Sequence, residues 1–173
     1  METTRRELSI FAAEMMGAQA WAGQFNPRRV RHDRQLFRDN FETSSLPYMI
    51  LDPRPGLHIV DVNDAYISAT ITPRDQAVGR KLFDVYPDNP EDRDANGVAN
   101  LFESLQWAAQ RSMPHAMGVQ RYDVLNEAGQ FVPMYWRPVN TPIFDNNGRL
   151  TYLLHHVKKV DSQSRVMINQ TKI

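Results

Sequence analysis

The sequence predicts an α+β fold in which a five-stranded antiparallel sheet carries short helices on one face. Three observations predict it. Two short runs rich in Ile, Val and Tyr occupy 48–51 and 58–62, an amphipathic helical pattern covers about 95–111, and from 115 the apolar residues alternate as in strands. An order of two strands, several helices and three strands is typical of a single sheet with helices packed against it.

The composition limits the classes of protein to which the chain can belong. It has 173 residues, of which 42% are hydrophobic and 23% charged, as expected for one domain with an appendage. The formal net charge is zero, so no overall field attracts nucleic acid or an anionic membrane. Cysteine is absent, which excludes disulfides, thiolate nucleophiles and cysteine-ligated metals. With no apolar run near the roughly 20 residues of a membrane span and no signal peptide, we expect a cytoplasmic protein.

Residues 1–45 are predicted to form a helical extension of two helices. Thr4 and Glu7 fit a capping box. Apolar residues then recur at spacings of three and four over nearly three heptads, at Leu8, Phe11, Met15, Ala18, Ala22 and Phe25. This seam either folds back on its own domain or pairs with a second copy in a homodimer, and the sequence leaves both open. Five arginines between 28 and 38 are interleaved with Asp33 and Asp39, which favours a solvated helix face over a nucleic-acid surface.

The first two strands are predicted to form a hairpin that leads directly into a helix. Residues 52–56 contain two prolines and a glycine, which turn the chain between the strands. Asn63 and Asp64 follow the second strand and are residues that cap helices. We therefore expect Asn63 to be structural, with its amide tying the hairpin to a short helix that carries Tyr66.

Two further helices are predicted before the last strands. Thr72 is placed to cap a short helix that ends at Gly79. The long helix at about 95–111 has an apolar stripe made of Val98, Leu101, Phe102, Leu105 and Ala109. At about 100° per residue, Trp107 lies opposite Val98. We expect an N-terminal helix to cover this tryptophan.

The last third of the chain is predicted to form three strands, at 115–125, 131–144 and 150–160. Asp145–Gly148 is a strong hairpin turn between the second and the third. Because proline has no N–H to donate, the middle strand should be bulged or irregular at Pro133, Pro138 and Pro142.

These elements and their residues resemble the PAS domain family over about 41–161. The resemblance is carried by five stretches in the family's order, VNDAY at 62–66, VGRKLFDVYPD at 78–88, QRYDV at 120–124, YWRPVNTPIFD at 135–145, and NGR with YLLHHV at 147–149 and 152–157. The combination is similar to PAS modules of bacterial sensor histidine kinases. The family often ends its last strand with Asp-x-Thr, whereas this chain has Lys159-Val160-Asp161-Ser162.

The resemblance implies a sensory module with a PAS domain at 46–161, an N-terminal extension at 1–45 for dimerisation or signalling, and a tail or linker at 162–173. It also implies a pocket for a small molecule or cofactor. A cysteine-linked flavin is excluded, and haem is disfavoured because the family usually takes iron through a histidine of the long helix, which has none here. A non-covalent flavin, or haem on another histidine, stays open. The cofactor is therefore unknown.

Strand alternation selects the site residues. It places Leu153 and His155 on one face of the last strand, and in the PAS family this face looks into the cavity. The same parity directs Met134 and Trp136 inward from the middle strand, with Tyr122 on the strand before. We expect these five residues to contact the ligand. The alternative is core packing for Trp136 and Tyr122, and for His155 a buried neutral imidazole bonded to Tyr122 or to backbone.

No catalytic centre is predicted. The five histidines show no metal spacing on a helix, and the eight glycines are scattered among turns rather than gathered in a phosphate-binding loop. Two functions remain. One is an input module of a two-component system that senses an unidentified small molecule, with a histidine kinase or other output domain outside this chain. The other is a ligand-free PAS module that serves homodimerisation or partner binding.

Overall fold

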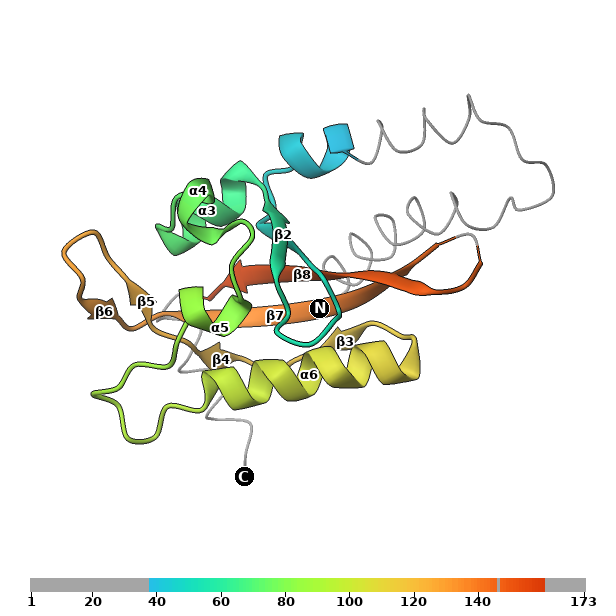
Figure 1. The fold of residues 1–173 in the computed structure, drawn as a ribbon. Helices are drawn as coiled ribbons and strands as arrows, with labels where there is room; N and C mark the ends of the chain where they lie inside the picture. Colours follow the sequence, from blue (N-terminus) through green and yellow to red (C-terminus); the bar gives the residue numbers. More distant parts are fainter. Residues whose placement is uncertain (1–37, 146, 161–173) are drawn as a thin grey trace.

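The computed structural model describes residues 38–145 and 147–160 (Figure 1). A short helical segment at 38–43 precedes the sheet. The helices are α3 (Asp64–Thr70), α4 (Arg74–Ala77), α5 (Leu82–Val85) and α6 (Gly97–Arg111). The strands are β1 (Tyr48–Leu51), β2 (Ile59–Val62), β3 (His115–Ala116), β4 (Gln120–Arg121), β5 (Val124–Leu125), β6 (Phe131–Val132), β7 (Tyr135–Phe144) and β8 (Leu150–Lys159). The predicted α+β class and antiparallel sheet are confirmed.

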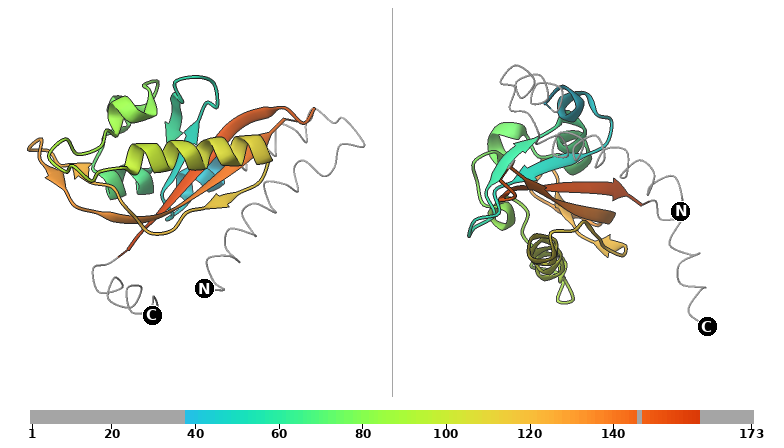
Figure 2. Two further views of the ribbon diagram at one scale, coloured as in Figure 1. Left: turned by 90° about the horizontal axis from the view of Figure 1, so that it is seen from below. Right: turned by 90° about the vertical axis from the view of Figure 1, so that its right-hand side faces the viewer.

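The main sheet has the strand order β2-β1-β8-β7-β3, and β4 also pairs with β7. All of these pairings are antiparallel. The first strand of the domain therefore lies beside its last, which closes the chain on itself. In Figure 2, α6 lies on one side of this sheet and the segment 38–43 lies on the other.

The two strands predicted at 115–125 and 131–144 are both interrupted. The predicted strand 115–125 is three short pieces, β3, β4 and β5. Asp123 lies between the last two and accepts hydrogen bonds from Arg121 and Asn89. The middle strand breaks at Pro133, and β6 pairs only with β5 in a separate two-stranded sheet. The expected irregularity of this strand is confirmed at Pro133. It is wrong at Pro138 and Pro142, which keep a regular register between β7 and β8.

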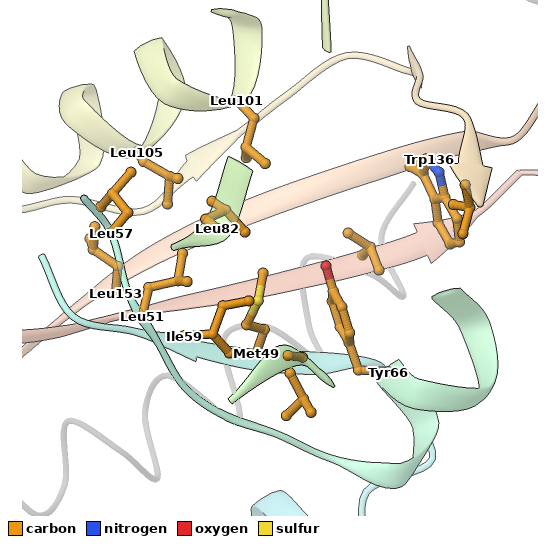
Figure 3. Close-up of a cluster of buried hydrophobic side chains, with 14 of the residues drawn as sticks. Met49, Leu51, Leu57, Ile59, Tyr66, Leu82, Leu101, Leu105, Trp136 and Leu153 are labelled. Atoms are coloured by element: carbon orange, nitrogen blue, oxygen red, sulfur yellow. The ribbon is translucent and has the colours of Figure 1, made fainter. Parts of the chain in front are cut away.

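Two hydrophobic clusters cover the two faces of the sheet. The larger lies between the sheet and the helices and includes Met49, Leu51, Leu82, Leu105 and Trp136 (Figure 3). The smaller lies on the opposite face and joins Phe41 of the segment 38–43 to three strand residues, Tyr48, Ile50 and Leu154. All four residues of β1 are buried because each face of this strand is covered.

Asn63 connects three parts of the chain through one side chain that is fully buried. Its Oδ1 accepts hydrogen bonds from the backbone N–H of Tyr48 at 3.0 Å and of Tyr66 at 2.9 Å. Its Nδ2 donates to the carbonyl oxygens of Phe41 at 3.0 Å and Leu46 at 2.8 Å. The bond from the Tyr66 N–H to Oδ1 is the N-cap bond of α3, so the predicted capping and tying roles are both confirmed.

Two helix predictions are corrected. Thr72 does not cap α4, because its hydroxyl donates to the Thr70 carbonyl, and Pro73 holds the N-cap position without a side-chain bond. On α6 the buried residues are Leu101, Ser104, Leu105 and Ala108. The buried face therefore includes Ser104 and Ala108 in place of the predicted Phe102 and Ala109. Phe102 is 43% exposed as a result.

Trp107 lies at the edge of this α6 face, and its side chain is 38% exposed. Its ring stacks on His115, with centroids 4.7 Å apart. The N-terminal helix that we expect to cover it falls in 1–37, outside the described residues, as does the predicted tail from 162 onward.

Candidate functional site

A cavity lies between the sheet and the helices, bounded by α3, α5, α6 and the inner face of β4, β7 and β8. The volume that the centres of water molecules can occupy is about 40 Å³. One water needs roughly 10–15 Å³ on this measure, so the space holds about three waters or a compact organic molecule. The side chains and backbone that line it come from Tyr66, Thr70, Leu82, Tyr86, Gly97, Leu101, Met117, Gln120, Tyr122, Val124, Trp136, Pro138, His155 and Val157.

Three of the five predicted site residues, Tyr122, Trp136 and His155, line this cavity together. Met134 and Leu153 do not line it, although both are buried as predicted, at 8% and 1% exposure. They pack within the large core cluster. Tyr122 is half-buried and the other four predicted residues are buried, but strand parity could not give each residue's distance along the strand from the open space.

His155 is the most deeply buried polar group of the cavity wall, at 2% exposure. Its Nδ1 lies 2.7 Å from Oδ1 of Asn140, so its partner is this amide. The predicted alternative of a bond to Tyr122 or to backbone is wrong in its partner. Burial, with a smaller effect of the neighbouring His156, lowers the pKa of His155 to about 3. The imidazole is therefore neutral at neutral pH.

The bond to Asn140 is the first of a chain of hydrogen bonds that leads out of the core. Nδ2 of Asn140 donates to Oγ of Ser104 at 2.7 Å, and that hydroxyl lies 2.7 Å from Nδ1 of His115. His115 is half-buried and carries the stacked Trp107 ring. Asn140 is fully buried and Ser104 is 2% exposed, so the chain runs through the interior until it reaches His115.

Three tyrosines place hydroxyl groups near the same space. Burial raises the pKa of Tyr66, Tyr86 and Tyr122, so all three are neutral. The Tyr122 hydroxyl donates to the Tyr86 carbonyl, and the Tyr86 hydroxyl lies 3.4 Å from Oγ1 of Thr70. Figure 3 shows the hydroxyl end of Tyr66 pointing away from α3 and into the interior.

A glycine at the start of α6 makes room for the Tyr122 ring. A Cβ added at Gly97 would lie 2.5 Å from Cδ2 of Tyr122, closer than real carbon atoms approach. The main chain of α6 can therefore approach the ring directly, and the cavity wall at this point is glycine backbone.

Four polar residues of this region were missed by strand and helix patterns, namely Tyr66, Tyr86, Ser104 and Asn140. Ser104 had a usable signal, because it sits three residues after Leu101 within the apolar stripe of α6, where a small polar side chain needs a partner. Asn140 also had one, as an amide with the same strand parity as Trp136, which was predicted to point inward. Neither signal identifies the partner residue.

The cavity does not fit the non-covalent flavin that the sequence leaves open. A flavin ring system is several times larger than a space for about three waters, so it would require the walls to move. The whole chain also lacks the cysteine that an adduct needs. Within 38–145 and 147–160, no three His, Asp or Glu side chains are grouped as a metal site.

Comparison with known proteins supports the fold. No family model matches the sequence, and no curated protein matches it. Among the described residues, no helix is long and apolar enough to cross a membrane. The likeness to known proteins therefore comes from three-dimensional structure.

Solved structures with PAS and light-oxygen-voltage (LOV) domains are similar to this chain. A PAS domain from Colwellia psychrerythraea gives a TM-score of 0.56 at 16% identity, covering 73% of this chain and 96% of that one. A LOV protein of Rhodobacter sphaeroides gives 0.58 at 13% identity, covering 78% and 70%. A LOV domain studied with a flavin analogue gives 0.57 at 14% identity, covering 80% and 93%. The chain has the fold of PAS and LOV sensory domains.

Proposed function

We propose that the chain is a sensory input module of bacterial signal transduction that binds a small neutral molecule in the cavity beside His155. The signal passes to an output domain, a histidine kinase or another effector outside this chain, through helical contacts of a cytoplasmic homodimer. The chain itself catalyses no reaction. The likeness to sensory domains supports the general class, and the cavity supports the ligand.

The observation that carries the proposal is an interior space with polar atoms directed at it. Nε2 of His155 and the Tyr66 hydroxyl have no hydrogen-bond partner among the described residues. Every side-chain N or O atom of those residues that is fully enclosed has a partner, so neither of these two atoms is fully enclosed. Both atoms therefore border the open space. A filled structural core would avoid such tips, because each unsatisfied buried group costs about 1–3 kcal/mol. Apolar walls with a few convergent polar groups are what a small-molecule site needs.

Ligand retention tests the proposal directly. Small molecules released from the purified full chain are identified by mass spectrometry, and an absorbance scan checks for flavin and haem. A metabolite library is then screened for compounds that raise the melting temperature, because a ligand of the folded state stabilises it.

Adjacent histidines on β8 give a matched pair of variants. His155→Leu removes the cavity-facing imidazole, whereas His156→Leu changes a residue that is equally buried but bonds to Pro47 on the opposite face. Both variants should lose stability, and only His155→Leu should lose the ligand while remaining folded. Equal loss of ligand from the two variants would contradict a role for the cavity.

The second candidate is an interaction module with a core that holds only ordered water. The small cavity volume of about 40 Å³ favours it. If the purified protein carries no small molecule and no library compound stabilises it, the sensing function is wrong and the interaction module stands.

A further inference from the structure

The hydrogen-bond chain at the cavity has a direction, and this direction determines what the cavity can bind. His155 on β8 lies directly opposite Asn140 on β7, and Asn140 lies directly opposite His115 on β3. Three neighbouring strands thus align the three side chains in one row, and Ser104 of α6 bridges the second and third.

The orientation of the Asn140 amide follows from its neighbours. Its Nδ2 faces two groups that can accept, Oγ of Ser104 at 2.7 Å and Sδ of Met117 at 3.8 Å. The reverse orientation would place the carbonyl oxygen against the thioether sulfur, which has no proton to donate. The amide oxygen therefore points at Nδ1 of His155, at 2.7 Å.

This orientation fixes the proton on His155. Since Oδ1 of Asn140 can only accept, Nδ1 of His155 must donate. A neutral imidazole has one ring proton, so Nε2 carries a lone pair and no hydrogen. Nε2 is also the ring nitrogen that borders the cavity, because Nδ1 is used within the core.

We infer that the cavity selects a compact, uncharged, largely apolar molecule that donates one hydrogen bond, through a hydroxyl or N–H group, to Nε2 of His155. The inference rests on the proposed function and adds the chemical class of the ligand. Small phenols, alcohols and nitrogen heterocycles with an N–H belong to this class. A molecule whose only polar group is an acceptor can accept from the Tyr66 hydroxyl but leaves Nε2 of His155 unsatisfied, so it should bind more weakly.

The cavity wall supports the remaining limits of this class. None of the lining residues is Asp, Glu, Lys or Arg, so a charged ligand would be buried without a counter-ion. An acceptor facing the Nε2 lone pair would leave both groups unsatisfied. The volume of about 40 Å³ keeps the ligand small: a single ring already requires the walls to yield slightly, and a larger molecule would require them to move apart.

The first experiment reads the proton position in the full-length wild-type protein. Long-range ¹H–¹⁵N correlation spectra of ¹⁵N-histidine-labelled protein separate protonated from unprotonated ring nitrogens, and His155→Gln assigns the resonances. We expect His155 to hold its proton on Nδ1, with Nε2 unprotonated. A proton on Nε2 would overturn the inference, whatever the protein binds.

The second experiment compares two probes of nearly equal size, phenol and fluorobenzene, by calorimetry and by the shift in melting temperature. Phenol should bind about 3- to 10-fold more tightly, because it alone can donate. His155→Phe keeps a ring of similar shape without the acceptor and should abolish this preference.

The outcomes separate the inference from the proposed function. Equal binding of both probes would overturn the ligand class and leave a functional cavity. Preference for fluorobenzene would do the same. Binding of neither probe, together with no retained metabolite, would overturn the sensing function itself.

Discussion

Replacing Asn63 by alanine should be among the most damaging single changes to a polar residue in this domain. The alanine loses the cap of α3, which costs about 1 kcal/mol. It also removes the hydrogen bonds that the buried amide makes with the Tyr48 N–H and with the carbonyls of Phe41 and Leu46, at about 1 kcal/mol for each bond. Tyr66 keeps a second acceptor, the Asn63 carbonyl at 3.0 Å, so its N–H adds little. The expected loss is about 3–5 kcal/mol, a large part of the 5–15 kcal/mol typical of a folded domain.

Urea unfolding of the full chain, followed by circular dichroism, measures this loss. Asn96→Ala is the matched control, since Asn96 holds the N-cap position of α6 but is exposed and makes no capping bond. It should cost no more than about 0.5 kcal/mol. If Asn63→Ala and Asn96→Ala lower the free energy of unfolding equally, the buried hydrogen bonds of the Asn63 side chain add no stability and the prediction is wrong.

Three further predictions follow. The folded-state pKa of His155, about 3, lies below its unfolded value of 6.5, so the unfolded chain binds the extra proton and stability should fall as pH drops below 6.5. The slope should reach at most about 1.4 kcal/mol per pH unit, and urea titrations of His155→Gln should show a flatter profile; an identical profile would contradict the shift. Deleting 1–26 should convert a dimer into a monomer by light scattering, and an unchanged number of subunits would refute the N-terminal seam. Deleting 1–37 in a Trp21→Phe, Trp136→Phe background should shift the emission of Trp107 to the red, whereas unchanged emission would mean that no N-terminal helix covers it.

The fold was predictable because its signals are local. The two hairpin turns, the Asn63 cap and the proline break at Pro133 each depend on a few adjacent residues whose backbone preferences are strong. Their order along the chain then leaves few arrangements for one sheet. The contacts at the break between β4 and β5 were not predictable, because Asp123 there meets Asn89 from a distant part of the chain.

The site was only partly predictable because it depends on the register between strands. Near the hairpin turn Phe144 faces Leu150, whereas Ile143 faces Tyr152, so one extra residue of β8 is accommodated in a bulge. Without this bulge Asn140 would face Leu154 rather than His155, on the other face of the sheet. The alternation pattern gave the buried face of His155, but no sequence pattern gave the partner that fixes its proton.

The segment 38–43 gives the domain a short mechanical path from its amino-terminal side to the cavity. Phe41 is locked against the outer face of the sheet, and its carbonyl is held by Asn63, whose Oδ1 also holds the first turn of α3. On the same helix Tyr66 forms part of the cavity wall. A displacement of α3 by an occupant would therefore pull on Phe41 through a single amide group, without passing through the ladder of strands. The Asn63 side chain would thus couple α3 to the segment 38–43, and a displacement would be passed to the part of the chain that precedes residue 38.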